Sequence, residues 1–505
     1  MKKIDDEIQL LLKEHNGNIR EILEENSRLD YLYALSEQRE LLLEWYDFDP
    51  EGEILQIGAD YGAMTGLFRT SVAQVTVLDE DANALRTVEL RYPGAANIRY
   101  ENGSLFDLKE ERAEGFDYVV FAGTLQAPYE EQLQAAKALL KPDGVLIVAV
   151  PNALGMKYFS GTADEANAMT KVQLAQLLPG GRFYYPMPDY RTPVSIYSDQ
   201  YLPKKGDMTR VTPAYDYPRY HMMDMGQKFD TACEAGLFDL YANSYLVFWS
   251  SSPERLENGE DPIYVKYNKT RKEVFQIKTC ICEAKKEGGR RRYVEKAALS
   301  LAGSAHIDSF RKKEEELMQQ HRVLKVASPE YRPDRNSAFF PYLEGQTWAE
   351  KLGQQISGGQ LPLEALSQAL DQVYDIRPEF RSSFVRTEEF DEVFGEGLCE
   401  EELALLGQDT ACRVSNIDAL FENMLLTEDG IYCLDYEWVF LFPVPEHFVK
   451  YRILYYFYEQ YSSVMKQLSL DQILSAFGIT PEMAAVYRKM EVNFQNYVHG
   501  ENQQL

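Results

Sequence analysis

The stretch from Glu53 to Asp79 constrains the fold of this 505-residue chain more than any other. It reads EILQIGADYGAMTGLFRTSVAQVTVLD, which predicts a strand, a glycine-containing turn, a helix and a second strand. Gly58 and Gly62 bracket a turn where a side chain would obstruct close backbone approach, and the helix that follows would point its free N–H groups at a ligand. The second strand ends in Asp79, and a carboxylate there suits a ribose diol. The stretch therefore predicts a nucleotide-type site, although tight strand-to-helix turns also select glycine for structural reasons alone.

Composition limits the classes of protein to consider. A chain of 505 residues exceeds one ordinary core, so we expect two main domains. The net charge of −28 argues against broad contact with a phosphate backbone, so nucleic acid is not an expected partner. No run is long and apolar enough for a membrane span, and the acids of MKKIDDEIQLLLKEH interrupt what would be the apolar core of a signal peptide. We therefore expect a cytoplasmic protein.

The cysteines and histidines do not favour a metal site. The six cysteines are scattered, and the six histidines spread from His15 to His499. Neither set has the spacing of zinc ligands, so we interpret the cysteines as structural thiols.

The first half alternates helix and strand. Residues 1–46 carry leucines at helical spacing and predict capping helices, with a partner-binding helix as the alternative. After Asp79 the pattern predicts helices and strands in turn, over 81–92, 97–101, 116–121, 129–140 and 145–150, the last strand following a Lys141-Pro-Asp-Gly144 turn. This order is typical of an α/β domain with a mostly parallel sheet.

Four ordered motifs carry a resemblance to a known family. ILQIGADYGAMTG, VTVLDED, FDYVVFAGTLQ and LLKPDGVLIVAVPN resemble the motif series of class I S-adenosylmethionine-dependent methyltransferases. The resemblance implies a Rossmann-like domain over residues 47–250 that binds S-adenosylmethionine. It further implies the following roles: Gly58, Ala59, Asp60 and Gly62 line the methionine end of the cofactor, Asp79 holds the ribose, and Ser104 and Leu105 flank the adenine.

Three positions depart from the family pattern. Gln56 stands where an acid usually opens the first motif, Asp60 replaces its middle glycine, and Ser104 replaces the acid usual near the adenine. A weakened cofactor site is therefore the alternative to an ordinary one.

The runs NALGMKYFSG and FYYPMPDYRTPVSIYSDQYLP are rich in Tyr, Pro and Asp and resemble methyltransferase-like proteins encoded with bacterial surface-polysaccharide enzymes. The candidates to face an acceptor are Asn152, Lys157, Tyr158, Asp189, Tyr190 and Asp199. Methylation of a sugar hydroxyl would favour a general base, for which we consider Asp189 or His221. Asp189 could equally brace a turn. A phosphate acceptor would need no base because it is already anionic, and would ask mainly for orientation.

The polar segment SSPERLENGEDP predicts a linker at 251–262, and the secondary-structure pattern of the sequence changes after it. Three antiparallel strands are expected over 263–267, 273–283 and 292–299, the last two joined by a turn at Gly288-Gly289, followed by a helix over 307–321. Lys296 lies in the third strand and Glu314 lies on the helix, so the two side chains could meet as an ion pair.

The sequence SNIDALFENMLLTEDGIYCLDYEW predicts a hairpin around the turn 427–430. Asn423 and Asp435 come together at its open end, and two oxygen ligands side by side suit Mg²⁺. Asp418 lies five positions before Asn423 and could act as the base for a hydroxyl. The alternative is an exposed hairpin with incidental polar ends.

This set resembles the protein-kinase-like fold in its small-molecule phosphotransferase branch. The resemblance implies an α+β, two-lobed domain over residues 263–500 that binds ATP and Mg²⁺. By it, Lys296 contacts the nucleotide phosphates, Glu314 orients Lys296, Pro341–Glu344 is the hinge, Asp418 is the catalytic base, and Asn423 and Asp435 hold Mg²⁺. A glycine-rich loop is lacking and Asn416 stands where His or Arg is usual, so a pseudokinase is an alternative.

A methyltransferase followed by a kinase-like domain resembles bifunctional enzymes of bacterial surface polysaccharide biosynthesis. The resemblance implies a glycan or lipid-linked glycan acceptor and association with glycan-assembly enzymes. Two alternatives stay open: a methyltransferase with a pseudokinase binding domain, and a non-enzymatic scaffold of a polysaccharide-assembly complex.

Overall fold

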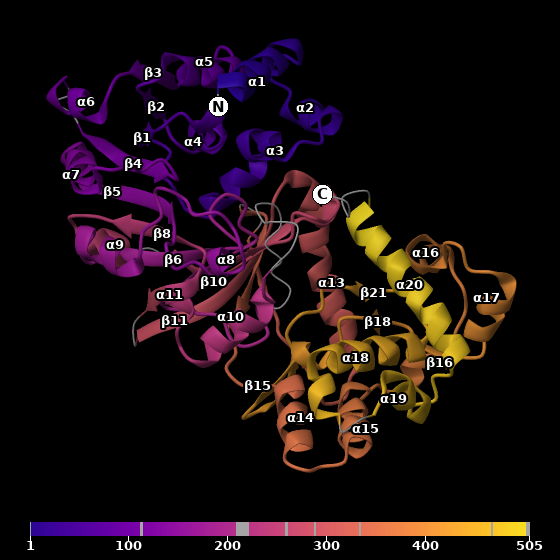
Figure 1. Ribbon diagram of the computed structural model, residues 1–505. Coiled ribbons are helices and arrows are strands. Elements are labelled where there is room, and N and C mark those ends of the chain that lie inside the picture. Colours follow the sequence, from indigo (N-terminus) through magenta and orange to yellow (C-terminus); the bar gives the residue numbers. More distant parts are fainter. Residues whose placement is uncertain are drawn as a thin grey trace. The chain divides into compact units, whose positions relative to one another are not determined.

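The computed structural model describes residues 2–111, 115–208, 222–257, 261–286, 289–332, 335–465 and 468–500 (Figure 1). The chain divides into two compact units. The first comprises Met1–Tyr267 with Cys280–Arg291, and the second comprises Asn268–Thr279 with Arg292–Leu505. The domain boundaries expected from the sequence stay a prediction, and each unit is described by itself below.

The first unit begins with the helices that the leucine spacing predicts. They are α1 (Lys2–Glu14), α2 (Ile19–Glu25), α3 (Leu29–Leu35) and the 3-10 helix η1 (Glu37–Leu42). Helix α1 packs along α5 (Ala82–Arg91), where the Gln9 amide donates to the Thr87 hydroxyl at 2.9 Å and to the Asn83 side chain at 3.0 Å. These buried contacts join the N-terminal helices to the rest of the unit.

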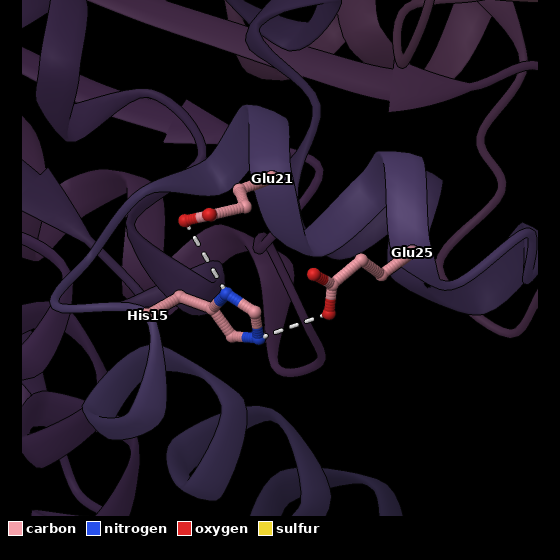
Figure 2. Close-up of side chains that lie close together, drawn as sticks. All are labelled: His15, Glu21 and Glu25. Atoms are coloured by element: carbon pink, nitrogen blue, oxygen red, sulfur yellow. Dashed lines mark ion pairs between the residues drawn. The ribbon is translucent and has the colours of Figure 1, made fainter.

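His15 closes the turn between α1 and α2. Its Nδ1 lies 3.4 Å from a Glu21 carboxylate oxygen and its Nε2 lies 3.5 Å from Glu25, so the two ring nitrogens face different carboxylates (Figure 2). The ligand-type atoms of the three residues lie within 4.8 Å of one another, but both glutamates are exposed. The arrangement accounts for the packing of this turn without a metal.

One sheet forms the centre of the first unit. Its strands are β1 (Glu53–Ile57), β2 (Gln74–Asp79), β3 (Ile98–Asn102), β4 (Phe116–Ala122), β5 (Leu140–Pro151), β6 (Arg182–Met187), β7 (Ser195–Ser198), β8 (Ser244–Trp249) and β9 (Pro262–Tyr267). They lie in the order β9-β7-β6-β8-β5-β4-β1-β2-β3. The strands β1 to β5 pair in parallel, whereas β8, β6, β7 and β9 add antiparallel pairs. The predicted α/β, Rossmann-like architecture is confirmed.

The turn predicted at Lys141–Gly144 is wrong in detail, because these residues belong to β5. Phe116 pairs with Leu140 but Tyr118 pairs with Val145, so the register shifts and the extra residues of β5 bulge out. Lys141 is fixed there by an ion pair with Asp117 at 2.7 Å. Pro and Gly in this run therefore mark a bulge within one strand.

Helices follow or cover these strands, including those expected after β1, β2 and β4. Besides α5 they are α4 (Thr65–Ser71), α6 (Leu105–Glu111), α7 (Tyr129–Ala138), α8 (Met156–Phe159), α9 (Lys171–Leu177), α10 (Met225–Glu234), α11 (Phe238–Tyr241) and α12 (Pro253–Glu257). The side chains of β4, β5 and β8 form the core between them, and most of these side chains are fully buried.

The second unit begins with parts of two long strands, β10 (Ile277–Lys286) and β11 (Gly289–Ala298). The predicted strand at 273–283 starts later than expected, because Glu273–Phe275 form the 3-10 helix η3. Gly288, in the predicted turn, lies outside the described residues. The helix predicted at 307–321 is α13 (Ser304–Gln320), which starts one turn earlier.

The remaining strands of the second unit are short. They are β12 (Lys325–Val326), β13 (Glu330–Arg332), β14 (Ser337–Pro341), β15 (Gln346–Thr347), β16 (Arg381–Ser383), β17 (Thr410–Cys412), β18 (Ser415–Asn416), β19 (Met424–Thr427), β20 (Gly430–Cys433) and β21 (Val439–Phe440). The hairpin predicted around residues 427–430 is confirmed, with Thr427 paired to Gly430 and Met424 to Cys433. β12 and β15 flank this hairpin in a four-stranded sheet.

Helices build most of the core of the second unit. They are α14 (Trp348–Ser357), α15 (Pro362–Val373), α16 (Glu388–Phe390), α17 (Glu400–Leu406), α18 (Glu446–Tyr461), α19 (Leu470–Ala476) and α20 (Pro481–His499). Their buried faces share one hydrophobic cluster with the β19–β20 hairpin. Within the part of the chain that the structure describes, no helix is both long and apolar enough to cross a bilayer.

Candidate functional site

The first site lies at the carboxyl end of β1, where the sheet order reverses. β1 has β2 on one side and β4 on the other, so its neighbours leave in opposite directions, as at the ligand crevices of open α/β sheets. Gly58 follows β1 with φ +86°, and its N–H donates to Leu78 O at 2.8 Å. A Cβ at Gly58 would lie 2.6 Å from Thr124 Cγ2, and the Thr124 hydroxyl donates to the Ile57 carbonyl. Glycine is therefore required at position 58 by both backbone and space.

Asp79 joins the end of β2 to this turn. One carboxylate oxygen accepts the Ala59 N–H at 2.8 Å, and the other accepts the Asp81 N–H at 2.9 Å. The structure thus brings the predicted residues Gly58, Ala59 and Asp79 together. Each carboxylate oxygen has a second lone pair for a further donor.

Gln56 also supports the turn from within β1. Its amide nitrogen donates to Gly58 O at 3.1 Å, and its amide oxygen accepts the Thr65 hydroxyl at 2.8 Å. Gln56 is buried, so these bonds satisfy both ends of the amide. This departure from the family pattern is accommodated by the local structure.

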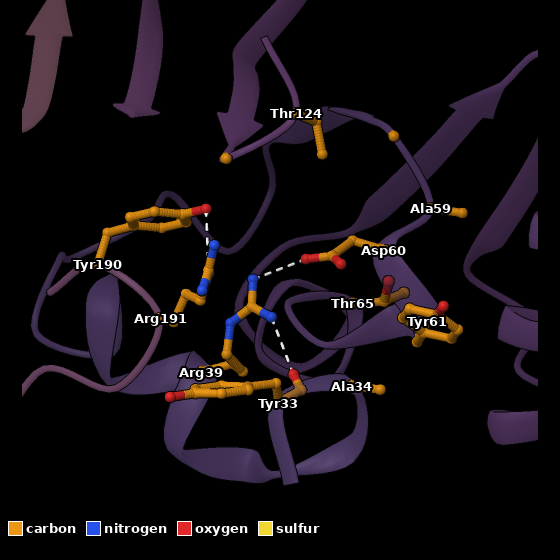
Figure 3. A network of polar contacts seen from close by, with 12 residues as sticks. Tyr33, Ala34, Arg39, Ala59, Asp60, Tyr61, Thr65, Thr124, Tyr190 and Arg191 are labelled. Carbon is orange, nitrogen blue, oxygen red and sulfur yellow. Dashed lines mark hydrogen bonds and ion pairs between the residues drawn. The ribbon is translucent and has the colours of Figure 1, made fainter. Parts of the chain in front are cut away.

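Asp60 and Tyr61 form the outer corner of the turn, and Gly62 ends it with φ +74°. The Asp60 carboxylate accepts from Arg39 at 2.6 Å (Figure 3). Sequence reasoning missed Arg39. Arg39 lies before the motif in the sequence. The only signal for it was that the Asp60 carboxylate would need a positively charged partner.

Ser104 and Leu105 lie after β3, at the start of α6. The Ser104 hydroxyl caps this helix by accepting the Asp107 N–H at 3.2 Å and donates to the Asp107 carboxylate at 2.7 Å, and Leu105 is buried. A Cβ on the neighbouring Gly103 would have no heavy atom within 4 Å, so there is open space beside these residues.

The residues expected to face an acceptor are mostly engaged with one another. Asn152 is fully buried and donates to Leu240 O at 2.8 Å and Ala242 O at 2.7 Å, so its role is structural. Lys157 is also fully buried and pairs with Glu165 and with Asp189, the latter at 3.2 Å. These two residues therefore cannot reach an acceptor in this structure. His221 lies outside the described residues.

Asp189 is buried and holds two partners. Its second oxygen accepts the Arg191 N–H at 2.7 Å. Burial would raise the pKa of Asp189, but the charges of Lys157 and Arg191 outweigh it and lower the pKa below its usual value. A carboxylate in this state is poorly suited to accept a proton at neutral pH.

Tyr158 and Tyr190 lie around the same network, whereas Asp199 has other partners. The Tyr158 hydroxyl donates to Glu165 at 3.1 Å, and Asp199 accepts from Lys171 at 2.9 Å. Tyr190 covers Gly123 at the end of β4 so closely that a Cβ on Gly123 would lie 2.5 Å from the ring. Tyr190 thus lies at the same end of the sheet as Gly58.

The second site lies in the second unit, at the open end of the β19–β20 hairpin. Lys296 Nζ on β11 donates to Asp435 at 2.8 Å. Burial would lower the pKa of Lys296, but Asp435 and Glu437 raise it above its usual value, so the lysine is charged. The structure thus brings together two of the residues expected to bind a nucleotide and a metal.

Asp418 and Asn423 lie beside this pair. The Asn423 amide nitrogen donates to Asp418 O at 2.9 Å, and an Asp418 carboxylate oxygen accepts the Trp438 N–H at 2.8 Å. Burial, and then the negative charge of Asp435, raise the pKa of Asp418 to about 7. A carboxylate with a pKa near neutrality matches the requirement for a general base.

The expected ion pair between Glu314 and Lys296 is not formed among the described residues. The buried face of α13 instead carries Lys313, whose Nζ donates to Glu437 O at 2.6 Å. Burial lowers the pKa of Lys313 to about 8. At this turn the helix buries the stem of Lys313 and leaves Glu314 half-exposed.

Sequence reasoning also missed Glu437. This buried carboxylate pairs with Arg271 and, at 2.7 Å, with His306. Burial opposes its charge, but Arg271 and His306 hold the pKa of Glu437 well below its usual value. Its position two residues after Asp435 was the only available signal.

The comparison with protein families concerns the first unit. Residues 26–202 match the methyltransferase domain family. The N-methyltransferase NodS from Bradyrhizobium japonicum, in complex with S-adenosylhomocysteine, is 19% identical, with a TM-score of 0.21, over 24% of this chain and 63% of its own. Phosphoethanolamine N-methyltransferase 1 from Haemonchus contortus, in complex with phosphoethanolamine and S-adenosylhomocysteine, is 14% identical, with a TM-score of 0.27, over 37% of this chain and 45% of its own. This chain therefore spans less than two thirds of either protein, and no curated protein matches it.

The residues of the first site fit S-adenosylmethionine. Gly58 and Ala59 present backbone at the end of β1, Asp79 offers lone pairs for a ribose diol, and open space lies at Gly103 beside Ser104. The strand order and the family match agree with this donor set. Residues 26–202 therefore form a class I S-adenosylmethionine-dependent methyltransferase domain.

Proposed function

We propose that the protein modifies a bacterial cell-surface glycan or its lipid-linked precursor in the cytoplasm. In this proposal the second unit is a phosphotransferase that uses ATP and Mg²⁺ to phosphorylate the glycan, and the first unit then methylates it. The choice of a glycan as acceptor rests on two resemblances to proteins of bacterial surface-polysaccharide synthesis, that of the tyrosine-rich runs and that of the order of the two units. Association with glycan-assembly enzymes belongs to the same proposal.

The state of Asp189 favours a phosphate oxygen as the methyl acceptor. S-adenosylmethionine, when bound, supplies an electrophilic methyl group. The turn at Gly58, Ala59, Asp60 and Gly62 would hold its methionine end, Asp79 its ribose, and Ser104 and Leu105 its adenine. Both oxygens of Asp189 are engaged and its pKa is lowered, so an acceptor that is already anionic suits this site better than a hydroxyl.

The contact of Lys296 with Asp435 is the single observation that carries the phosphotransferase proposal. It places a charged lysine beside a carboxylate at the open end of a hairpin. Because the Asn423 nitrogen is bound to Asp418 O, its amide oxygen is the atom left for a cation. Asn423 and Asp435 would hold Mg²⁺, which neutralises phosphate charge, and Lys296 would orient the nucleotide.

Asp418 would accept the proton of the attacking hydroxyl. Its raised pKa makes it a stronger base than an ordinary aspartate, and the Trp438 N–H fixes its orientation. Glu314 forms no ion pair with Lys296 among the described residues. We therefore propose that Glu314 does not orient Lys296 and lies at most at the edge of the nucleotide site.

One experiment separates the proposed two-step enzyme from its two alternatives, a methyltransferase with a pseudokinase binding domain and a non-enzymatic scaffold. The purified chain is incubated with a surface glycan acceptor and S-adenosylmethionine labelled in the methyl group, with and without Mg²⁺-ATP. The proposal predicts labelled glycan only when ATP is present. Label without ATP would instead indicate a methyltransferase whose second unit only binds. Failure of the chain to bind either cofactor by calorimetry would indicate a scaffold.

A further inference from the structure

The outer corner of the cofactor turn has a strained backbone. Asp60 has φ +40° and Tyr61 has φ +54°, so two consecutive residues with side chains adopt the left-handed region. This conformation is uncommon, especially for a bulky residue, and persists only where the surroundings enforce it. The corner therefore needs partners that hold it.

Arg39 holds the side chain of Asp60. It lies on η1, with a side chain that is only 6% exposed, and its Nη2 donates to Asp60 at 2.6 Å. Its Nη1 donates to Tyr33 O at 3.0 Å, which fixes the guanidinium (Figure 3). A partly buried, charge-assisted hydrogen bond is among the stronger contacts available.

Arg91 holds the backbone of Tyr61. It is buried at the end of α5, and its Nη1 donates to Tyr61 O at 3.1 Å and to Ala34 O at 3.3 Å. Its Nη2 donates to Leu35 O at 2.9 Å. One guanidinium thus satisfies the last carbonyls of α3 and joins them to the turn.

The Tyr61 side chain reaches the first helix. Its hydroxyl donates to Asp5 on α1 at 2.6 Å. The corner is therefore tied to α1, to the end of α3 and to η1 at once. A generic turn of this kind solves the same problem with a glycine, which adopts positive φ without support.

We propose that Arg39 and Arg91 are positioning residues for the cofactor, and that the N-terminal helices α1, α3 and η1 are a working part of the S-adenosylmethionine site. Contacts from these helices hold residues 60 and 61 in the left-handed backbone region. Without those contacts this conformation would be unfavourable, because residue 60 is not glycine. This inference rests on cofactor binding by the methyltransferase domain and assigns a purpose to the helices that precede its motifs.

A double-mutant cycle on the full chain tests the proposal. S-adenosylhomocysteine binding is measured by calorimetry for the wild type, Arg39→Gln, Asp60→Gly and the double variant. We expect Arg39→Gln to weaken binding on the order of tenfold in the Asp60 background, because the corner is then free to relax. In the Asp60→Gly background the same change should weaken binding by less than about twofold, because glycine needs no brace.

The matched control is Arg20→Gln. Arg20 also lies on an N-terminal helix and pairs with Glu24 at 2.9 Å, but its side chain is 85% exposed, so binding should not change. Equal losses for Arg39→Gln in both backgrounds would overturn the proposal. A wild type that binds no S-adenosylhomocysteine would instead contradict the cofactor function itself.

Hydrogen exchange gives a second readout without cofactor. Arg39→Gln should speed exchange at the amides of residues 60–64, whereas Arg20→Gln should not. If Arg39→Gln does not fold, Asp60→Asn takes its place, since asparagine tolerates the left-handed region but loses the charge that Arg39 binds. Unchanged exchange and unchanged affinity in that variant would also overturn the proposal.

Discussion

The two sites of this chain are held in place by different physical means. In the first unit, the turn from Gly58 to Gly62 offers mainly backbone, and buried side chains from elsewhere fix its shape. In the second unit, the site is a group of opposite charges that neutralise one another, in which Lys296 and Glu437 are buried and Asp435 is partly exposed. A backbone site is sensitive to shape, and a charge site is sensitive to the loss or protonation of one member.

The largest effect is expected from removing a member of the charge site. Asp435→Ala should reduce the proposed phosphotransfer to background, since it removes a proposed metal ligand and leaves Lys296 buried without its partner. Binding of S-adenosylhomocysteine should stay unchanged. Both are measured on the same protein by an ATP-dependent transfer assay and by calorimetry.

Asp429→Ala is the control for that variant, because Asp429 lies on the same hairpin but is 69% exposed. It should affect neither measurement. A parallel loss of both activities in Asp435→Ala would contradict the independence of the two sites.

Shape sensitivity of the first site is tested by Gly58→Ala. Its Cβ would meet Thr124 at 2.6 Å in a backbone that disfavours alanine. We expect S-adenosylhomocysteine affinity to fall at least about tenfold, from strain of about 1–3 kcal/mol.

Gly94→Ala separates backbone strain from contact. Gly94 also has positive φ, at +73°, but a Cβ there would meet nothing within 4 Å. This variant should lower the free energy of unfolding by about 1 kcal/mol and leave affinity unchanged. Equal affinities for the Gly58→Ala and Gly94→Ala variants would show that shape at the turn does not matter.

The charge site should respond to pH around neutrality. Because the pKa of Asp418 is raised to about 7, its carboxylate becomes available only as pH rises through that value. Phosphotransfer should increase about tenfold per unit below pH 7 and level off above it. Asp418→Asn should lose both the activity and this profile. A flat profile in the wild type would exclude Asp418 as the base.

The same group affects stability with the opposite sign. Its pKa is higher in the folded chain than in the unfolded chain, so the folded state binds the proton more tightly. The contribution to stability is present below about pH 4 and is lost as pH rises towards 7. Denaturant unfolding of the wild type and Asp418→Asn across this range should show the difference.

The smallest effect is expected from an exposed ion pair that resembles the buried one. Lys325 pairs with Asp429 at 3.0 Å, nearly the distance of Lys296 to Asp435, but Lys325 is 42% exposed. Lys325→Ala should cost about 0–1 kcal/mol of unfolding free energy, and added salt should reduce it further. A loss as large as that of Lys296→Ala would mean that burial does not distinguish the pairs.

Much of the first unit could be predicted because its signals are local. The strand at Glu53, the turn at Gly58 and the acid at Asp79 are close in sequence, and each reports its own backbone requirement. The bulge at Lys141–Gly144 was misread as a turn because Pro and Gly mark both features.

The residues that contact the site residues could not be predicted, since they lie far away in the sequence. Arg39 meets Asp60 across 21 positions, and Arg271 meets Glu437 across 166. At one turn of α13 it is Lys313 and not Glu314 that is buried, because the two residues are adjacent and both charged, and only packing decides between them. The functional roles of all the predicted site residues, Ser104, Leu105 and Asn423 among them, stay predictions.

The ion pair between Arg39 and Asp60 has a consequence for sequence evolution. If Arg39 is needed only while residue 60 carries a side chain, the two positions form an epistatic pair. Relatives with glycine at position 60 should tolerate many residues at position 39, whereas relatives with aspartate should keep arginine there. The order of the two changes also matters, because a lineage that gains aspartate first would pass through a weaker enzyme.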